Sequence, residues 1–384
     1  MDPLPVRLAD LTSELAGQAV SLGARLHPQT AANLAEMVRM MNCYYSNLIE
    51  GHNTRPRDIE RALGGDLEVE PERRSLQLEA LAHIKVQRSI DAAFTGGTLT
   101  EPASVPFLTS THRAFYAELP SELLRVEGTQ RSFTLTPGEF RTLPEHEVSV
   151  GRHLPPSSAK VAEFMRHFEQ RYRLASLGRT SRMVAMAAAH HRFNFIHPFP
   201  DGNGRVSRLM SHAIALEAGI GAHGLWSISR GLARGLKERS EYRRMMDLAD
   251  SPRRGDLDGR GNLSQQALEE FVHWFLQVAL DQVTFMGALF QLETLSERLS
   301  AFALDHLRLK QEAAPLLEEV LIRGELQRGD APRATGLKDR AARAVLGELV
   351  EVGLLGSATP KGPVSIRFPD AARDVLFPRL FLEA

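Results

Sequence analysis

The sequence predicts an all-helical protein of 384 residues. Apolar residues recur at helical spacing along most of the chain, whereas the alternating pattern of a half-buried strand is rare. Hydrophobic residues make up 43% of the chain and aromatic residues 7%, which is ordinary for a globular protein. The length is sufficient for two or three domains, each with its own core.

Two long helices are expected in the N-terminal region, residues 1–100. Residues 28–50 are amphipathic, with a proline near the start and a glycine after the end, positions that favour helix boundaries. Residues 71–94 are rich in leucine and alanine and predict the second helix. The glycines and the proline that follow interrupt the pattern, so we place a boundary near residue 100.

Residues 101–295 are expected to form the main helical domain. The apolar pattern predicts helices in five segments: 105–119, 157–175, 179–195, 225–250 and 264–293. The stretch 128–156 differs, because glycines and prolines interrupt it and Glu147-Val148-Ser149-Val150 alternates in polarity. This stretch predicts a small β-hairpin.

The C-terminal residues 310–384 predict a separate module. Helical patterns at 314–323, 330–336 and 338–352, followed by a hairpin ending in 364–368, resemble a winged helix-turn-helix. If this module binds DNA, the contacts are expected from four basic residues of the helix at 338–352 and the wing: Lys338, Arg340, Arg343 and Lys361. Only eight basic residues stand against five acidic ones between residues 323 and 368, a weak excess for phosphate binding. Packing against the core, against a second subunit or against another protein is the open alternative.

The twelve residues from His197 to Arg208 read H-P-F-P-D-G-N-G-R-V-S-R, and they predict a pocket for a polyphosphate and a metal ion. The two glycines allow a tight turn and a close approach of backbone N–H groups to an anion. The helical pattern that follows places the loop at a helix N-terminus, where the helix dipole favours negative charge. Gly202, Asn203 and Gly204, including the Asn203 side chain, are therefore expected to form an anion hole.

Two further side chains of this loop suit a phosphoryl-transfer reaction. His197 is the one group of the loop that ordinarily titrates near neutral pH, so it is the candidate general base. Asp201 offers a hard oxygen ligand that suits Mg²⁺ bridging nucleotide phosphates. Arg205 and Arg208 are three residues apart and are expected to reach along one phosphate chain.

The loop resembles the signature of the Fic family, H-x-F-x-[DE]-G-N-G-R-x-x-R, at every fixed position. The resemblance implies a helical Fic fold and transfer of AMP from ATP to a hydroxyl group of a target protein. It implies that Phe199 is buried beneath the loop, that Arg205 holds the β-phosphate and that Arg208 meets the γ-phosphate. The stretch around Glu147, Val148, Ser149 and Val150 is similar to the family's hairpin flap, which holds a target segment by backbone pairing. An ordinary surface hairpin is the alternative.

A second short segment, Ser46-Asn-Leu-Ile-Glu50-Gly51, resembles the inhibitory motif [ST]-x-x-x-E-[GN] of Fic proteins. Ser46 and Glu50 are four residues apart and so share one helix face. The resemblance implies that Glu50 pairs with Arg208 and denies that arginine to the γ-phosphate of ATP. Without the resemblance, the segment is simply a helix that ends at a glycine.

The sequence as a whole therefore predicts an autoinhibited protein adenylyltransferase with ATP as substrate and Mg²⁺ as cofactor. Two alternatives stay open: a hydrolase that removes AMP from a modified protein, with Glu50 orienting water, and a DNA-binding regulator that senses a nucleotide. The expected partners are ATP and an unidentified protein with an exposed hydroxyl group. A second copy of the chain and DNA remain open as further partners.

Charge and cysteine content point to a cytoplasmic protein. The formal net charge is −1, so no overall field attracts nucleic acid or a membrane surface. Cys43 is the single cysteine, which precludes an intramolecular disulfide and favours a reducing compartment. No apolar run approaches the roughly 20 residues of a membrane span, and the N-terminus lacks the pattern of a secretion signal.

Overall fold

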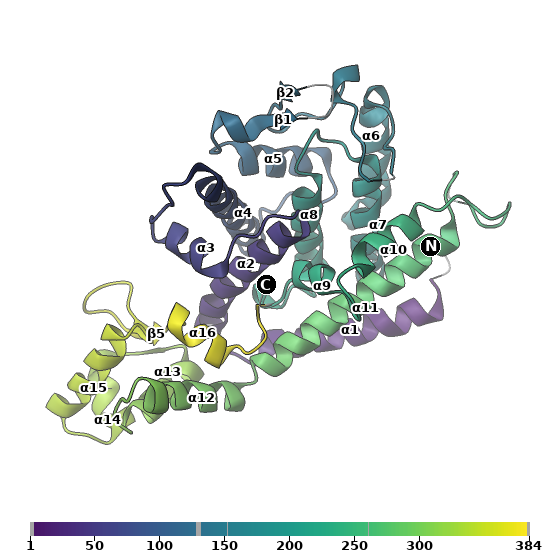
Figure 1. Ribbon diagram of the computed structural model, residues 1–384. Coiled ribbons are helices and arrows are strands. Elements are labelled where there is room, and N and C mark those ends of the chain that lie inside the picture. The colour runs from purple at the N-terminus through teal and green to yellow at the C-terminus, as the bar shows by residue number, and fades with distance from the viewer. Residues whose placement is uncertain (1–3, 128–131, 152, 260, 382–384) are drawn as a thin grey trace. The chain divides into compact units, whose positions relative to one another are not determined.

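The computed structural model describes residues 4–127, 132–151, 153–259 and 261–381. Within them the fold is almost wholly helical, with a few very short strands (Figure 1). The predicted all-helical class is confirmed.

The chain divides into two compact units. The core unit contains the described residues of 1–17, 42–221 and 227–282, and the C-terminal unit contains those of 18–41, 222–226 and 283–384. These units do not follow the expected division at residue 100. The reason is that α4 (Pro71–Thr95), which precedes that point, packs against α5 (Val105–Tyr116) and α8 (Asn203–Glu217), which follow it. Three long helices continue from one unit into the other: α1 (Val6–Ala24), α2 (Pro28–Ile49) and α11 (Gln265–Leu289).

The core unit is built around two helices, α7 (Arg179–Ile196) and α8, which make the most extensive helix–helix contact of the described chain. Its remaining helices surround this pair, with α4 and α5 against α8 and with α6 against α7. Small side chains such as Ala187 and Ala189 are fully buried on α7, and they allow the close packing that a helix pair needs. The helices confined to this unit are α3 (Pro56–Leu63), α4 (Pro71–Thr95), α5 (Val105–Tyr116), α6 (Val161–Tyr172), α7 (Arg179–Ile196), α8 (Asn203–Glu217), α9 (Ile228–Arg234) and α10 (Glu241–Ala249).

The helical segment expected over 225–250 consists of two shorter helices, α9 and α10. Gly235 follows α9 with a φ of 66°, a left-handed conformation that ends the helix. The carboxylate of Glu241 then accepts hydrogen bonds from the N–H groups of Leu236 (2.7 Å) and Lys237 (3.2 Å). These bonds fix the turn between the two helices.

The hairpin of the core unit lies earlier than the alternating residues suggest. Strand β1 (Arg125–Glu127) pairs antiparallel with β2 (Ser132–Thr134), with Val126 opposite Phe133. Residues 128–131 and Arg152, part of the predicted hairpin stretch, lie outside the described residues.

The strand expected at Glu147–Val150 is not formed. Pro144–His146 make a 3₁₀ turn, and in the part of this stretch that the structure describes only Val150 makes a bridge, with His153. The Glu147 carboxylate accepts a hydrogen bond from the N–H of Ser158 at 2.8 Å and therefore braces a loop. A role of residues 147–150 in positioning a target remains a prediction.

The C-terminal unit combines short helices with a three-stranded antiparallel sheet of order β3-β5-β4. Helices and a hairpin occur where the sequence predicted them, and Lys338, Arg340, Arg343 and Lys361 are all exposed. The structure adds strand β3 and the final helix, which the sequence did not predict. The elements are α12 (Leu292–Ala301), a π-helical turn (Phe302–His306), α13 (Ala313–Arg323), β3 (Glu325–Leu326), α14 (Ala331–Thr335), α15 (Asp339–Glu351), β4 (Leu355–Gly356), β5 (Val364–Ile366) and α16 (Asp370–Leu376).

Within the described residues, no single helix is both long enough and apolar enough to cross a membrane. One bent pair of helical segments, Gln265–Leu289 with Leu292–His306, meets that test by length and composition alone.

Candidate active site in the loop between α7 and α8

The candidate general base lies at a strained point of the backbone. His197 directly follows α7 and has a φ of 50°, a left-handed conformation that is uncommon for residues with a side chain. Arg141 holds it there: its fully buried guanidinium donates to the carbonyl oxygens of His197 (2.7 Å) and Ile196 (3.0 Å). The N–H of Arg141 also donates to the carbonyl of Pro198 at 2.8 Å.

The His197 imidazole is arranged to act as a base. Its Nδ1 lies 3.4 Å from the carbonyl oxygen of Asn194, a long hydrogen bond that places the proton on Nδ1 and leaves Nε2 free to accept one. Burial lowers the pKa of His197 to about 4, because a half-buried site disfavours the charged form. The ring is therefore neutral at pH 7.

The interior of the loop is fixed by Phe199 and Asn203. Phe199 is fully buried, as the sequence predicted, and its ring stacks on His112 with 3.9 Å between centroids. The Asn203 side chain accepts from the N–H of Phe199 (2.9 Å) and donates to its carbonyl (2.8 Å). These two bonds brace the loop, and a part of this side chain in an anion hole remains a prediction.

The backbone at the start of α8 keeps the features of an anion site. Gly202 has a φ of 78°, and a Cβ at this position would come within 2.8 Å of the Tyr116 hydroxyl. The first N–H groups of α8, including that of Gly204, have no acceptor within the helix and point along its positive end. Only glycine fits at 202, and this glycine places the helix N-terminus beside the loop.

Asp201 is held ionised at the edge of this site. The Tyr116 hydroxyl donates to its Oδ2 at 2.6 Å, and Arg205 lies 3.8 Å from the same atom. Burial alone would raise the pKa of Asp201, but Arg205 and the hydrogen bonds outweigh it and hold that pKa below its usual value. His112 adds a brace, since its Nδ1 accepts from the N–H of Gly138 (2.8 Å) and its Nε2 donates to the carbonyl of Asp201 (3.2 Å).

Arg205 has a carboxylate partner that the sequence did not reveal. Its guanidinium pairs with Glu79 of α4 at 3.0 Å and lies over the ring of Phe115, 5.0 Å from the centroid. His52 Nδ1 lies 2.9 Å from the same Glu79 oxygen. The Nε of Arg205 is buried and has no hydrogen-bond partner within the described chain.

Arg208 meets the end of α2, as the inhibitory motif implied. Its guanidinium pairs with Glu50 at 2.6 Å and donates to the Ser46 hydroxyl at 2.9 Å and the Ser46 carbonyl at 3.2 Å. Burial alone would raise the pKa of Glu50, but Arg208 and Arg205 outweigh it, so the pKa lies below its usual value. Gly51, with a φ of 88°, follows the helix and turns the chain away.

The Glu50 carboxylate rests directly on Gly204. A Cβ added at this position would collide with Glu50 Oε1 and come within 2.9 Å of Arg208. The ion pair therefore depends on the absence of a side chain at residue 204.

The structure thus brings the residues of both sequence motifs to one place. It also adds Arg141, His112, Tyr116, Glu79 and His52, none of which the sequence singled out. For Glu79 one signal was available in the sequence: it is an isolated acidic residue in the otherwise uncharged and mostly apolar middle of α4. The other four residues belong to no sequence motif that would have indicated a place in the site.

Comparisons with known proteins match this part of the chain to a family. Residues 107–215 match the model of the Fic/DOC family. The protein adenylyltransferase Fic of Drosophila melanogaster is 42% identical over 83 residues, which are 21% of this chain and 16% of that protein. The one of Aedes aegypti is 40% identical over 84 residues, with the same shares. The match thus spans about one sixth of the length of these relatives.

Solved structures of the family share the fold. A Fic family protein from Desulfovibrio desulfuricans G20 has a TM-score of 0.53 at 18% identity, covering 95% of this chain and 97% of its own. Fic-1 from C. elegans has a TM-score of 0.51 at 15% identity, covering 72% and 71%. Residues 107–215 of this chain therefore form a domain of the Fic/DOC family.

Proposed function

We propose that the protein transfers AMP from ATP to a hydroxyl group of a protein, and that Glu50 holds it in an inhibited state. The name of the relatives, protein adenylyltransferase, supports the reaction. The ion pair between Glu50 and Arg208 at 2.6 Å is the single observation that supports the inhibition.

In the proposed reaction, the target hydroxyl oxygen attacks the α-phosphorus of ATP and the bond from that phosphorus to the bridging oxygen breaks. Nε2 of His197 accepts the hydroxyl proton, and pyrophosphate leaves. The N–H groups at the start of α8 stabilise the charge on the α-phosphate. Arg205 and Arg208, one turn apart on α8, bind the β- and γ-phosphates.

The residues of the loop fit a Mg²⁺ ion. Asp201 presents one ionised carboxylate whose side chain is 55% exposed, and Mg²⁺ commonly takes one or two carboxylates together with substrate phosphates. No group of three or more histidine, cysteine or acidic side chains that could hold a metal occurs among the residues described, so the nucleotide would supply most ligands. When bound, the ion neutralises charge on the leaving pyrophosphate.

Inhibition follows from competition for one arginine. Arg208 is 1% exposed and already holds Glu50 and Ser46, so a γ-phosphate can reach it only if Glu50 leaves. Because Glu50 also covers Gly204, its carboxylate repels a phosphate at the helix N-terminus.

The test is Glu50→Gly with Mg²⁺-ATP labelled at the α-phosphate, incubated with cell lysate and analysed by mass spectrometry of modified peptides. We expect more modification of the protein itself and of its target than in wild type. Glu50→Gln, which keeps the shape and removes the charge, should activate as well, and Glu50→Gly combined with Arg208→Ala should lose the gain. A Glu50→Gly protein no more active than wild type on any hydroxyl-bearing substrate would contradict the inhibition.

One observation favours the hydrolytic alternative enough to test it. The ionised Glu50 carboxylate lies beside the proposed anion site and is one-third exposed, so it could orient a water molecule for attack on a protein-bound AMP. Release of AMP from a pre-modified protein by wild type, with loss of that release in Glu50→Gly, would assign hydrolysis to this site.

A further inference from the structure

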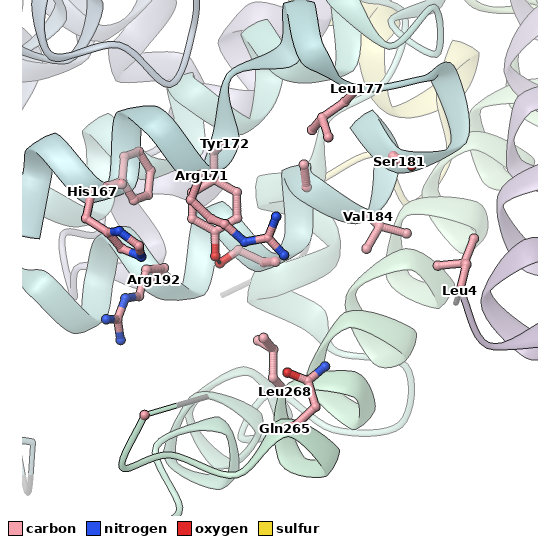
Figure 2. A pocket seen from close by; sticks show the side chains of 14 residues that line it. Leu4, His167, Arg171, Tyr172, Leu177, Ser181, Val184, Arg192, Gln265 and Leu268 are labelled. Carbon is pink, nitrogen blue, oxygen red and sulfur yellow. Dashed lines mark hydrogen bonds between the residues drawn. The ribbon is translucent and has the colours of Figure 1, made fainter. Parts of the chain in front are cut away.

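A cavity lies in the core unit, outside the loop between α7 and α8. It has a volume of about 440 Å³ and is lined by residues of α6, α7 and α11 (Figure 2). None of the residues from 197 to 208 lines it. The volume falls within the range of pockets that hold small organic molecules, roughly 300–1,000 Å³.

The lining combines an apolar wall with basic side chains. Phe168, Val184 and Leu268 supply apolar surface, whereas Arg171 and Arg192 are cationic and none of the lining residues is acidic. In Figure 2 the guanidinium of Arg171 points into the space that Leu268 borders from the opposite side. A bound molecule would therefore meet hydrocarbon and positive charge together.

Arg192 lacks a carboxylate within ion-pair distance in the described chain. It is half-buried, and its guanidinium lies over the rings of Phe164 and Phe195, 5.5 and 4.9 Å from their centroids. Burial lowers its pKa below the usual value, with attraction from Asp250 opposing this, and the group stays charged at neutral pH. Asp250 itself is engaged by His191 (2.8 Å) and His153 (3.1 Å).

Arg171, on α6, also forms no ion pair among the described residues. Its exposed side chain keeps its charge available at the entrance of the cavity. Arg192 is the partly buried cation of the two, and a partly desolvated cation without a counter-charge is unfavourable, so an anion placed beside it offsets that cost.

We propose that this cavity binds an organic anion with an apolar body. Its carboxylate or phosphate head would pair with Arg171 and Arg192, and its hydrocarbon part would pack against Phe168, Val184 and Leu268. Neutral and cationic analogues of the same size are expected to bind more weakly, because the basic side chains of the lining attract an anion and no acidic side chain attracts a cation.

The experiment is calorimetric titration of the full chain with decanoate, decanol and decylamine. We expect decanoate to bind with a Kd below about 1 mM and the other two to bind at least about tenfold more weakly. Arg171→Gln combined with Arg192→Gln should weaken decanoate binding by at least about tenfold. Arg166→Gln, an exposed arginine of α6 outside the cavity, is the matched control and should bind like wild type.

Ser181→Trp is a second test that does not depend on whether the double variant folds. Ser181 is exposed at the edge of the cavity, so a large side chain there should block decanoate without disturbing the core. Unchanged decanoate affinity in both the double variant and Ser181→Trp would overturn the proposal. Equal affinity for decanol, or no decanoate binding by wild type, would overturn it as well.

Discussion

Two arginines one turn apart on α8 are each paired with a glutamate, but the two glutamates have different settings. Glu79 lies in the middle of α4, and its side chain is 11% exposed. Glu50 lies just past the end of α2, and its side chain is 33% exposed. A carboxylate in the middle of a packed helix cannot leave without disturbing that helix, whereas one in a terminal turn can move by local fraying. We therefore expect the pair at Arg205 to be structural and the pair at Arg208 to be the one that can be released.

The largest effect should come from removing Glu79. Glu79→Ala leaves the buried Arg205 with only the more distant Asp201 carboxylate, at 3.8 Å, and breaking a buried ion pair costs about 3–5 kcal/mol of unfolding free energy. Thermal or urea unfolding measures this loss, with Glu72→Ala, an exposed acid of the same helix, as control. Glu50→Ala should lose less, because Arg208 keeps its hydrogen bonds to Ser46. Equal losses for both glutamates would remove the distinction between the pairs.

His197 belongs to neither ion pair, so its replacement separates chemistry from phosphate binding. In the released Glu50→Gly background, we expect His197→Ala to lose AMP transfer by at least about 100-fold. ATP affinity, measured by calorimetry, should stay close to that of the parent. Undiminished transfer would exclude His197 as the base.

The pH dependence of AMP transfer is a further test of the role of His197 as the base. Only the neutral form of His197 accepts a proton, and its pKa is lowered to about 4, so activity should decline only as the pH falls through that value. For Glu50→Gly, kcat/KM should therefore stay flat from about pH 6 to 8, since this ratio reports groups of the free enzyme. An acidic limb centred near the unperturbed histidine value of about 6.5 would show that burial does not govern this group.

The smallest effect is expected in the C-terminal unit, where exposed basic residues offer phosphates no enclosed site. About four contacts from Lys338, Arg340, Arg343 and Lys361 would give a slope of log affinity against log salt near −3 to −4. A gel shift with random duplex at roughly 50 mM salt compares wild type with the triple alanine variant at 338, 340 and 343. Identical mobility of the duplex with both proteins would leave this unit as a protein-contact module.

The sequence predicted those parts of the site that are encoded by short contiguous motifs. The residues from His197 to Arg208 are contiguous, and Glu50 stands in a motif of its own. By contrast, Glu79, Tyr116 and Arg141 reach the site only through the packing of α4, α5 and the segment after β2, which no local spacing encodes.

The features that the sequence did not predict have the same origin. The Asn203 amide bonds to the backbone of Phe199, and no local spacing encodes that contact. The alternation of polar and apolar residues at Glu147–Val150 predicted a strand. The neighbouring prolines and the hydrogen bond from the N–H of Ser158 to Glu147 favour a loop instead. Within 225–250, Gly235 separates α9 from α10. Its left-handed backbone conformation cannot be predicted from the spacing of apolar residues.

Glu50 and Arg208 are 158 residues apart in the sequence yet part of one chain. A competitor tethered in this way acts at an effective concentration fixed by the fold, and dilution of the protein does not reduce it. In the proposed inhibition, a rising nucleotide concentration would compete with a group that cannot diffuse away. Control of the proposed activity would therefore rest on whatever alters the conformation of the last turn of α2, and the amount of protein would change only the size of the response.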